Sequence, residues 1–556
     1  MACDSVRLFT DRAAAVQPGF ALDTNGLTSV AQIVTRLDGL PLAIELAAAR
    51  IGPLRPKDIV ARLDDRFAFL AGGQRAALPR QQALAATLEW SYELLGPSEQ
   101  AVLRRISVFA GSFSLDAACA VAASGELASH QVPQVIWDLV CKSLLTAVDE
   151  DPDVPRYRLL PTVRDYAAAL LNRAGDTASA VAAHRGYYHQ LATEAEAELT
   201  GPAQGRRLGS LRLDHDNLRM AITTPAASGP DRRKAAELFA ALSRYWFVHG
   251  QPTESIAFAT SLLQDIDPER DDALRARVLF AAAWASIYQV PATAMRWCQD
   301  AVTAAQRAGD DATKAEATSL LAAASYFHGD PDPAVGEEAL ALARTIGNPT
   351  ITGFALLSCA LTMWHHDSER CEQLHEEAAS VTGVSGDYLM HHIVLMNLGE
   401  LHYHRNDLRR AREYYETDIS IAAKIGYQDP MMLASFGRLL AQEGEHTAAM
   451  EYLLAALDTG RRYSTYHTLY PLYLIAHFAM ATGDDRRVAM LYSYAEKAAA
   501  DSGIAAPDLT GLMQEDLAQL RLRMGDGLQD TYQHGASLTL EEAITVAREL
   551  SAPKLP

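Results

Sequence analysis

Short polar turns recur at a nearly fixed interval through the second half of this 556-residue chain. The second residues of these turns lie 37, 40, 38 and 39 positions apart, and the turns are Gly329-Asp330, His366-Asp367, Asn406-Asp407, Gly444-Glu445 and Gly483-Asp484. A period in this range is typical of stacked helical hairpins, because a single hairpin cannot bury its apolar face alone. The period therefore predicts a mainly α-helical fold with an α-solenoid in its second half.

A second series of glycines marks the other end of each repeat. Gly309, Gly347, Gly386 and Gly426 lie 38, 39 and 40 positions apart. Glycine is favoured just after the last turn of a helix, where the backbone adopts left-handed dihedral angles. We expect these glycines to end the second helix of each pair.

Small residues recur where the two helices of a pair would touch. The matching positions before and after each turn are Leu398-Gly399 with Ala411 and Tyr415, Leu321-Ala322 with Ala334, Phe436-Gly437 with Ala449, and Ile475-Ala476 with Tyr492. Gly or Ala at these positions lets paired helices approach closely. The pattern resembles that of tetratricopeptide repeats, and residues 266–526 are predicted to form a tetratricopeptide-like solenoid.

Residues 1–75 show the periodicity of amphipathic helices, with Val30, Ile33 and Leu37 on one face. They also contain the run 39–50, whose start, Gly39-Leu40-Pro41-Leu42-Ala43, resembles the GLPLA signature of the NB-ARC-type ATPases in the STAND class of signalling proteins. The resemblance implies that residues 1–75 are a remnant of the helical lid that follows the nucleotide-binding core in that family.

Nucleotide chemistry in this family depends on a P-loop, which needs a Gly-Lys-Ser/Thr segment to hold phosphates and Mg²⁺. None of the seven lysines of this chain follows a glycine, so the sequence contains no such motif. In the family, the residues that match Gly39, Leu40, Pro41 and Leu42 contact the adenine side of the nucleotide. We expect this contact to be vestigial, and Pro41 to start the following helix. No cofactor is expected, and ATP or ADP would bind only if another polypeptide supplied a P-loop.

Residues 76–175 follow the order of a winged helix. Helical segments that include 87–92 and 103–111 come first. An extended segment at 143–148, a polar turn at 149–155, a second extended segment at 156–160 and a helix from Val163 then predict a β-hairpin wing and its closing helix. This region resembles the winged-helix unit that follows the lid in actinobacterial AfsR/LuxR-type ATPase regulators.

The charge of the chain bears on what this winged helix does. The formal net charge is −20, and no dense cluster of Lys and Arg interrupts the acidic surface. Such a surface repels a phosphate backbone. In the family this unit packs on the nucleotide module as a structural relay, and we expect a relay here and no DNA partner. A winged-helix DNA-binding transcriptional regulator is the alternative that the pattern leaves open.

Two further regions complete the predicted organisation. Residues 176–265 are interpreted as a helical connector with degenerate repeats, and residues 527–556 as a C-terminal capping helix and tail. Thr539 and Glu542 have the spacing of a capping box, which predicts a helix start at this point. In LuxR-type members this stretch leads into a C-terminal helix-turn-helix, so the resemblance implies that this motif, like the P-loop, lies outside the 556 residues.

The sequence favours a cytoplasmic protein without a membrane partner. The N-terminus has no apolar core of a signal peptide, and no 18 apolar residues follow one another. The six cysteines are scattered and contain no CxxC pair, which is unlike a disulfide framework or a structural zinc site. We expect reduced thiols and no bound metal.

Aromatic and histidine residues on the first helices of the repeats are the candidates for a ligand groove, because solenoids bind ligands on a concave face. The candidates are Tyr326, Trp364, His392, His402 and Tyr403, together with Phe327 and His365. The alternative for each is a place in the core between helices. Adjacent histidines on a helix point to different faces, which does not favour joint metal ligation.

The function predicted from these features is that of a non-catalytic signalling protein related to STAND transcriptional regulators. It would bind a protein partner or a small-molecule inducer through its solenoid. We do not expect an enzyme, because neither a P-loop nor a catalytic triad is found in the sequence. The alternatives are the DNA-binding regulator and one half of a split ATPase whose P-loop lies on another polypeptide.

Overall fold

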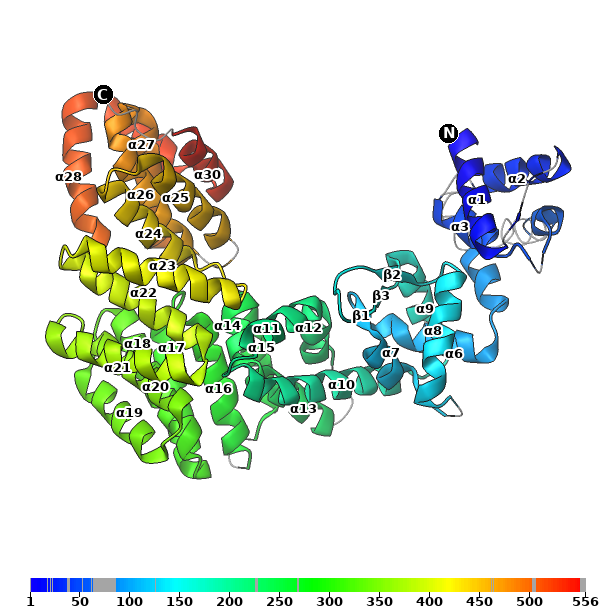
Figure 1. Cartoon of the computed structure of the whole chain (residues 1–556), viewed down its shortest axis with the longest axis horizontal. Helices are drawn as coiled ribbons and strands as arrows, with labels where there is room; N and C mark the ends of the chain where they lie inside the picture. Colours follow the sequence, from blue (N-terminus) through cyan, green and yellow to red (C-terminus); the bar gives the residue numbers. More distant parts are fainter. Residues whose placement is uncertain are drawn as a thin grey trace. The chain divides into compact units, whose positions relative to one another are not determined.

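A computed structural model describes residues 2–63 and 87–550, except positions 18, 21, 23, 38–40, 53, 62, 126, 226–228, 268–269, 462, 464 and 503–506. The fold is mainly α-helical, as predicted (Figure 1). The chain forms two compact units, of which the first contains Met1–Gln190 and Leu213–Lys234 and the second contains Leu191–Arg212 and Ala235–Pro556. The predicted boundary between residues 75 and 76 lies outside the described residues.

The first unit begins with three helices around an apolar core. These helices are α1 (Ala2–Val16), α2 (Thr24–Arg36) and α3 (Pro41–Ala48). The predicted apolar face of α2 is buried, and Ile33 and Leu37 pack in one cluster with Phe9 and Ile44. The helix α3 begins at Pro41, as predicted, because the missing N–H of proline costs nothing in the first turn.

A winged helix follows in the same unit. Its elements are α6 (Pro97–Arg105), β1 (Phe113–Ser114), α7 (Leu115–Ala122), α8 (Val132–Cys141), β2 (Thr146–Val148), β3 (Arg156–Arg158) and α9 (Pro161–Arg173). The strands β2 and β3 pair antiparallel and form the predicted wing, and β1 adds a third strand on the other side of β3. The closing helix starts at Pro161 and not at the predicted Val163, because proline is well suited to the first helical position.

Four helices cover the region in which the chain passes between the two units. They are α10 (Thr177–Glu198), α11 (Gln204–Leu213), α12 (His215–Thr223) and α13 (Gly229–Ala241).

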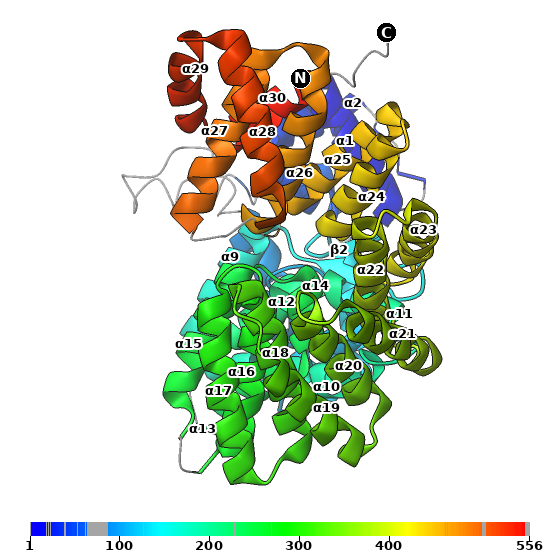
Figure 2. The same cartoon turned by 90° about the vertical axis from the view of Figure 1, so that its left-hand side faces the viewer.

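The second unit contains the predicted solenoid (Figure 2). Its helices are α14 (Ser243–His249), α15 (Pro252–Asp265), α16 (Asp272–Ser286), α17 (Pro291–Ala308), α18 (Asp311–His328), α19 (Pro333–Ile346), α20 (Pro349–Met363), α21 (Ser368–Ser385), α22 (Tyr388–His404), α23 (Leu408–Lys424), α24 (Pro430–Gln442), α25 (His446–Gly460), α26 (Thr465–Ala479), α27 (Asp485–Ser502), α28 (Pro507–Met524), α29 (Gly527–Ala536) and α30 (Leu540–Glu549). From α16 to α27 the helices pack as consecutive antiparallel pairs, and the first helices of neighbouring pairs also contact one another.

The glycine series occupies the helix ends that the sequence predicted. Gly309, Gly347 and Gly386 end α17, α19 and α21 with positive φ angles of 68°, 74° and 75°. Gly426 follows α23 with a φ angle of 63°. A side chain is strained at such angles, so the series of glycines sets where each second helix stops.

Close helix packing explains the small residues before the turns. A Cβ atom added at Gly399 of α22 would lie 2.5 Å from Cε1 of the buried Tyr415 in α23. At Gly437 of α24 it would lie 3.1 Å from the carbonyl oxygen of Ala449 in α25. The prediction for Ala334 was wrong, because this residue is exposed in the first turn of α19 and the buried small residue of that helix is Gly336.

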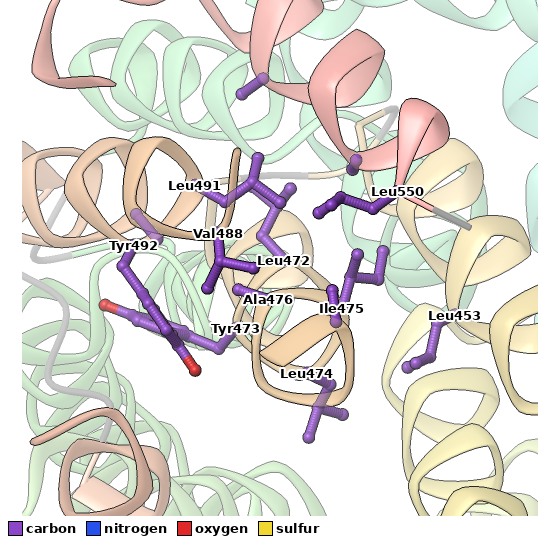
Figure 3. Packing of buried hydrophobic residues seen from close by; sticks show 14 of the residues in the cluster. Leu453, Leu472, Tyr473, Leu474, Ile475, Ala476, Val488, Leu491, Tyr492 and Leu550 are labelled. Atoms are coloured by element: carbon purple, nitrogen blue, oxygen red, sulfur yellow. The ribbon is translucent and has the colours of Figure 1, made fainter. Parts of the chain in front are cut away.

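A large apolar cluster ends the second unit. Figure 3 shows Leu472, Ile475 and Ala476 of α26 packed against Val488 and Leu491 of α27, with Leu550 beside them. The short helix α30 starts with the predicted capping box, in which Thr539 and Glu542 bond to each other's backbone N–H. Within the part of the chain that the structure describes, no helix combines the length and apolar character that crossing a bilayer requires.

Replacing Gly399 by alanine tests the close helix contact. We expect Gly399→Ala to destabilise the protein by about 1–3 kcal/mol, because the new methyl group overlaps the Tyr415 ring. Gly209→Ala is the matched control, since Gly209 lies exposed in α11 with open space around it and alanine favours helices by about 1 kcal/mol. Urea denaturation measures both, and equal stability of Gly399→Ala and the wild type would contradict the contact.

Candidate functional site

A cavity of about 360 Å³ lies along the first helices of the repeats. Its wall comes from α14 and from the helices α16, α18, α20, α22, α24 and α26 with their adjoining turns. The lining residues are Phe247, Trp284, Ile287, Tyr288, Leu320, Ala323, Tyr326, Phe327, Gly329, Pro331, Phe354, Leu357, Leu361, Trp364, His365, Met390, Ile393, Met396, Asn397, Glu400, His404, Asp429, Met431, Ser435, His467, Leu469 and Tyr470. This volume and this largely apolar wall suit a small organic ligand.

Aromatic rings hold one another in place on one side of the cavity. The rings of Trp284 and Phe354 stack with 5.3 Å between centroids and 12° between planes. Tyr288 meets Phe327 edge to face at 4.8 Å. Such contacts fix the rings in orientations that a flexible apolar side chain would not keep. The wall is therefore preformed.

A buried ion pair also reaches the cavity, through the lining residue Glu400. Glu400 accepts hydrogen bonds from Arg438 Nη2 and from the Tyr415 hydroxyl, both at 2.6 Å. The Arg438 guanidinium also lies 3.8 Å from the centroid of the Tyr403 ring. Burial acts to raise the pKa of Glu400, but the positive charge of Arg438 and the hydrogen bonds from Ser435 and Tyr415 together lower the pKa below its ordinary value. Glu400 is therefore a carboxylate at neutral pH.

A second charged group lies behind the cavity, where α22, α23 and α24 meet. His392 is fully buried, and it donates from Nδ1 to Asp418 (2.6 Å) and from Nε2 to Asp429 (3.1 Å). Burial acts to lower the pKa of His392, but the two carboxylates raise it to about 10. His392 is therefore an imidazolium ion at neutral pH. Asp429, which lines the cavity, also caps the first turn of α24.

The structure places the predicted groove residues in two groups. Tyr326 and Trp364 lie on the cavity wall, together with Phe327 and His365. The predicted residues His392, His402 and Tyr403 are not among the lining residues. His392 is held between its two carboxylates, and Tyr403 is covered by Arg438. His402 is buried beside Glu372 and stacks on Tyr414.

Sequence reasoning missed several wall residues, of which Phe247, Trp284, Phe354, Glu400 and Tyr470 are examples. The sequence could have indicated Trp284 and Phe354 as groove residues, because both are aromatic and lie on first helices within the predicted repeats. Phe247 and Tyr470 come from α14 and α26, which are far apart in the sequence. Only the curvature of the helix array brings them to one cavity.

The residues predicted to contact adenine belong to the first unit. Pro41 is exposed at the start of α3, and Leu42 follows it in the helix. Gly39 and Leu40 lie outside the described residues. The adenine-side contact stays a prediction. Among the described residues, no three His, Cys, Asp or Glu side chains are arranged to hold a metal ion.

The helix that reads DNA in many winged helices is here α8, and its surface is not basic. Trp137 is 63% exposed on this helix, Gln134 and Cys141 are exposed beside it, and α8 contains no Lys or Arg. The adjoining Lys142 is paired with Glu99. Residues 95–172 contain nine acidic and six basic residues. This surface lacks the positive charge that phosphate contacts require.

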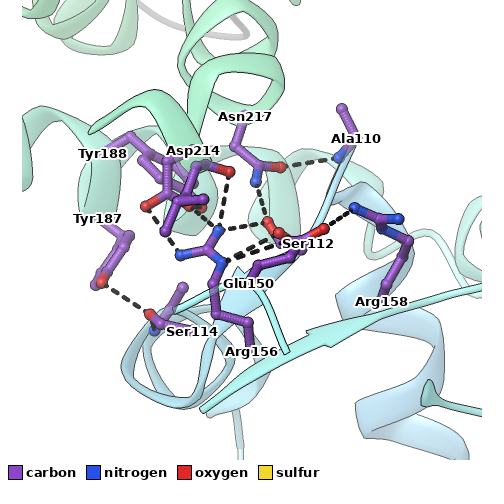
Figure 4. Close-up of polar contacts among 12 residues, drawn as sticks. Ala110, Ser112, Ser114, Glu150, Arg156, Arg158, Tyr187, Tyr188, Asp214 and Asn217 are labelled. Atoms are coloured by element: carbon purple, nitrogen blue, oxygen red, sulfur yellow. Dashed lines mark hydrogen bonds and ion pairs between the residues drawn. The ribbon is translucent and has the colours of Figure 1, made fainter. Parts of the chain in front are cut away.

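The wing is fixed by a buried arginine (Figure 4). Arg156 of β3 donates to the Asp214 carboxylate at 2.8 Å and to the carbonyl oxygens of Ser112 and Leu213, both at 3.0 Å. Asn217 of α12 donates to the same Ser112 carbonyl at 2.8 Å. Burial acts to lower the pKa of Arg156, but the hydrogen bond and negative charge of Asp214, together with Tyr188 and Glu150, raise it above the ordinary value. The strand β3 is therefore tied to the start of α12.

Residues 95–172 match the family described as a winged helix-turn-helix domain, which confirms the predicted winged helix. Proteins of Mycobacterium tuberculosis and Mycobacterium bovis, named provisionally as HTH-type transcriptional regulators, are 38% identical to this chain over 354 residues. That similarity covers 62% of this chain and 39% of each relative. An uncharacterized Mycobacterium tuberculosis protein is 42% identical over 188 residues, which cover 34% of this chain and 48% of that protein. The chain spans less than half the length of these curated relatives.

Two solved structures are similar at a low level. One is a STAND protein with a tetratricopeptide repeat sensor from Pyrococcus horikoshii, at 15% identity and a TM-score of 0.43, covering 98% of this chain and 74% of that chain. The other is a Rap protein complexed with Competence and Sporulation Factor, at 14% identity and a TM-score of 0.43, covering 67% of this chain and 99% of that chain. Both TM-scores are below 0.5, so neither structure bears on the site or its ligand.

Removing the imidazolium behind the cavity should destabilise the protein. We expect His392→Gln to cost about 3–5 kcal/mol at pH 7, because two buried carboxylates lose their cation. The contribution of His392 is complete below its unfolded pKa of 6.5 and is lost as the pH rises toward about 10, so the difference from the wild type should shrink above pH 7. Urea denaturation between pH 7 and pH 10 measures this difference.

The exposed His366 provides the matched control, and His366→Gln should change the free energy of unfolding by less than about 0.5 kcal/mol. Equal effects of the two substitutions, or a His392→Gln effect that stays constant up to pH 10, would contradict the described ion pairing.

Proposed function

We propose that this chain is part of a regulatory protein related to the STAND transcriptional regulators of the AfsR/LuxR kind, and that its solenoid binds a small-molecule inducer. The observation that carries the proposal is the preformed aromatic cavity of about 360 Å³ on the first helices of the repeats. The winged helix and the relatives named as transcriptional regulators support a regulatory role.

The cavity favours a small ligand over a folded protein partner. Its wall draws on seven helices, α14 and six first helices, and a ligand inside it contacts several repeats at once. A ligand that bridges repeats stabilises one curvature of the solenoid relative to others, since it binds one arrangement of the helices more tightly. That change in curvature is the signal that we propose the solenoid provides.

We propose that the winged helix relays this signal and does not read DNA. The absence of Lys and Arg from α8 and the fixed wing support this role. The match to a winged helix-turn-helix domain supports the alternative of a DNA-binding regulator.

We also propose that the chain binds no nucleotide by itself, and titration with ATP and ADP in a calorimeter tests this. Half of a split ATPase remains the alternative that a P-loop on another polypeptide would support.

Filling the cavity tests the ligand site. Tryptophol, a neutral indole alcohol, should bind the full chain in a saturable way by isothermal titration calorimetry. Ala323→Trp places a large ring inside the cavity and should weaken this binding at least tenfold, as should Met396→Trp at a half-buried lining position. Ala341→Trp, on the exposed face of α19, is the control and should leave the affinity within about twofold. Unchanged binding in both cavity variants would contradict the proposed site.

A titration against DNA tests the relay. We expect no saturable, salt-sensitive binding of the full chain to pooled genomic fragments, measured by fluorescence anisotropy at moderate salt, because α8 has no basic residue. A saturable curve whose midpoint moves to higher protein concentration with added salt would favour the DNA-binding alternative.

A further inference from the structure

The charged residues of the cavity are all of one sign. The chain contains 49 lysine and arginine residues, yet neither type is among the residues that line the cavity. Two carboxylates, those of Glu400 and Asp429, do line it. The wall therefore contains acidic residues but no Lys or Arg, whereas the cations Arg438 and His392 lie behind it.

The groups behind the wall leave one negative charge in excess. Arg438 balances Glu400, and His392 balances one of the two carboxylates of Asp418 and Asp429. Burial raises the pKa of Asp418 to about 6, which still leaves it ionised at neutral pH. Oδ2 of Asp418 is buried and accepts no hydrogen bond.

Further titratable groups face the same region. Burial lowers the pKa of His467 to about 4, so this lining histidine adds no positive charge at neutral pH. Burial also raises the pKa of Tyr470 above its ordinary value and keeps it neutral. His404 lies at the cavity with its Nε2 3.7 Å from Glu400 Oε2, which places its ring against the same carboxylate. Arg438 and His392 therefore balance two of the three carboxylates of Glu400, Asp418 and Asp429.

The aromatic wall suits a cation as well. The faces of aromatic rings attract ammonium and guanidinium groups, most strongly for Trp. One of these rings already holds a cation of the chain itself, because the Arg244 guanidinium lies over the Trp284 ring, 5.2 Å from its centroid. The ring centroids of Tyr326 and Trp364 lie 6.3 Å apart on the wall. Both residues are only half-buried, so their rings are accessible to a ligand.

We infer that the cavity binds a small organic monocation, in which an ammonium or guanidinium group is attached to an aromatic or aliphatic body. The inference rests on the proposed function of the cavity as a ligand site. The cationic group lies toward Glu400 and Asp429, and the apolar body lies against the aromatic wall. Ligands with a phosphate or carboxylate group, nucleotides included, would lose their hydration without meeting a lysine or arginine.

Three indole compounds of similar size test the charge preference. Tryptamine is a cation, tryptophol is neutral and indole-3-propionate is an anion at pH 7. We expect tryptamine to bind the full chain at least tenfold more tightly than tryptophol, and indole-3-propionate to bind more weakly than both, by calorimetry. Equal affinities, or tightest binding of the anion, would overturn the inference and leave the proposed ligand site intact. Failure of all three to bind would overturn the proposed function as well.

A matched pair of substitutions separates charge from shape. Asn397 lies half-buried on the cavity wall in α22. Asn397→Lys adds a positive charge and should reverse the order, so that indole-3-propionate binds more tightly than tryptamine. Asn397→Met has a side chain of similar length without charge, and it should change the affinities for tryptamine and tryptophol by the same factor. A preference for tryptamine that survives Asn397→Lys unchanged would overturn the inference, and circular dichroism checks that both variants are folded.

Discussion

The close approach of paired helices is the constraint on which the solenoid depends. Added Cβ atoms would lie 2.7 Å from Thr362 Oγ1 at Gly336, 2.8 Å from Thr382 Cγ2 at Gly353 and 2.5 Å from the Tyr415 ring at Gly399. Helices that pack at this distance bury their small residues between them. Many large aromatic residues of the first helices lie instead on the cavity wall, among them Trp284, Tyr326 and Phe354.

Buried ion pairs join helices of this row to one another. Arg244 of α14 donates to Asp387, the N-cap residue of α22, at 2.8 Å although the two are 143 positions apart. The pairs of His392 with Asp418 and Asp429, and of Arg438 with Glu400, tie α22 to the next helices. A buried charge that loses its partner is strongly destabilising, so these pairs stabilise one arrangement of the repeats. They also account for the carboxylates at one end of the cavity.

The sequence could predict several features that depend on local spacing. The glycines with positive φ, the helix start at Pro41 and the wing between β2 and β3 all follow from short patterns. The cavity depends on contacts between distant repeats, and the partner of Arg244 has no local signature. His392 illustrates the difference. Its position on a first helix predicts a groove residue, whereas the structure shows it buried between Asp418 and Asp429.

Hydrogen exchange with and without tryptamine, followed by mass spectrometry, tests the central claim most directly. We expect slower amide exchange in the first helices of the repeats, above all α16, α18, α20 and α22, because a ligand in the cavity suppresses their local opening. Exchange in α8 of the winged helix should not slow through direct contact, since that helix contributes no cavity residue. Protection of α8 with no change in the first helices would contradict the assignment of ligand binding to the solenoid.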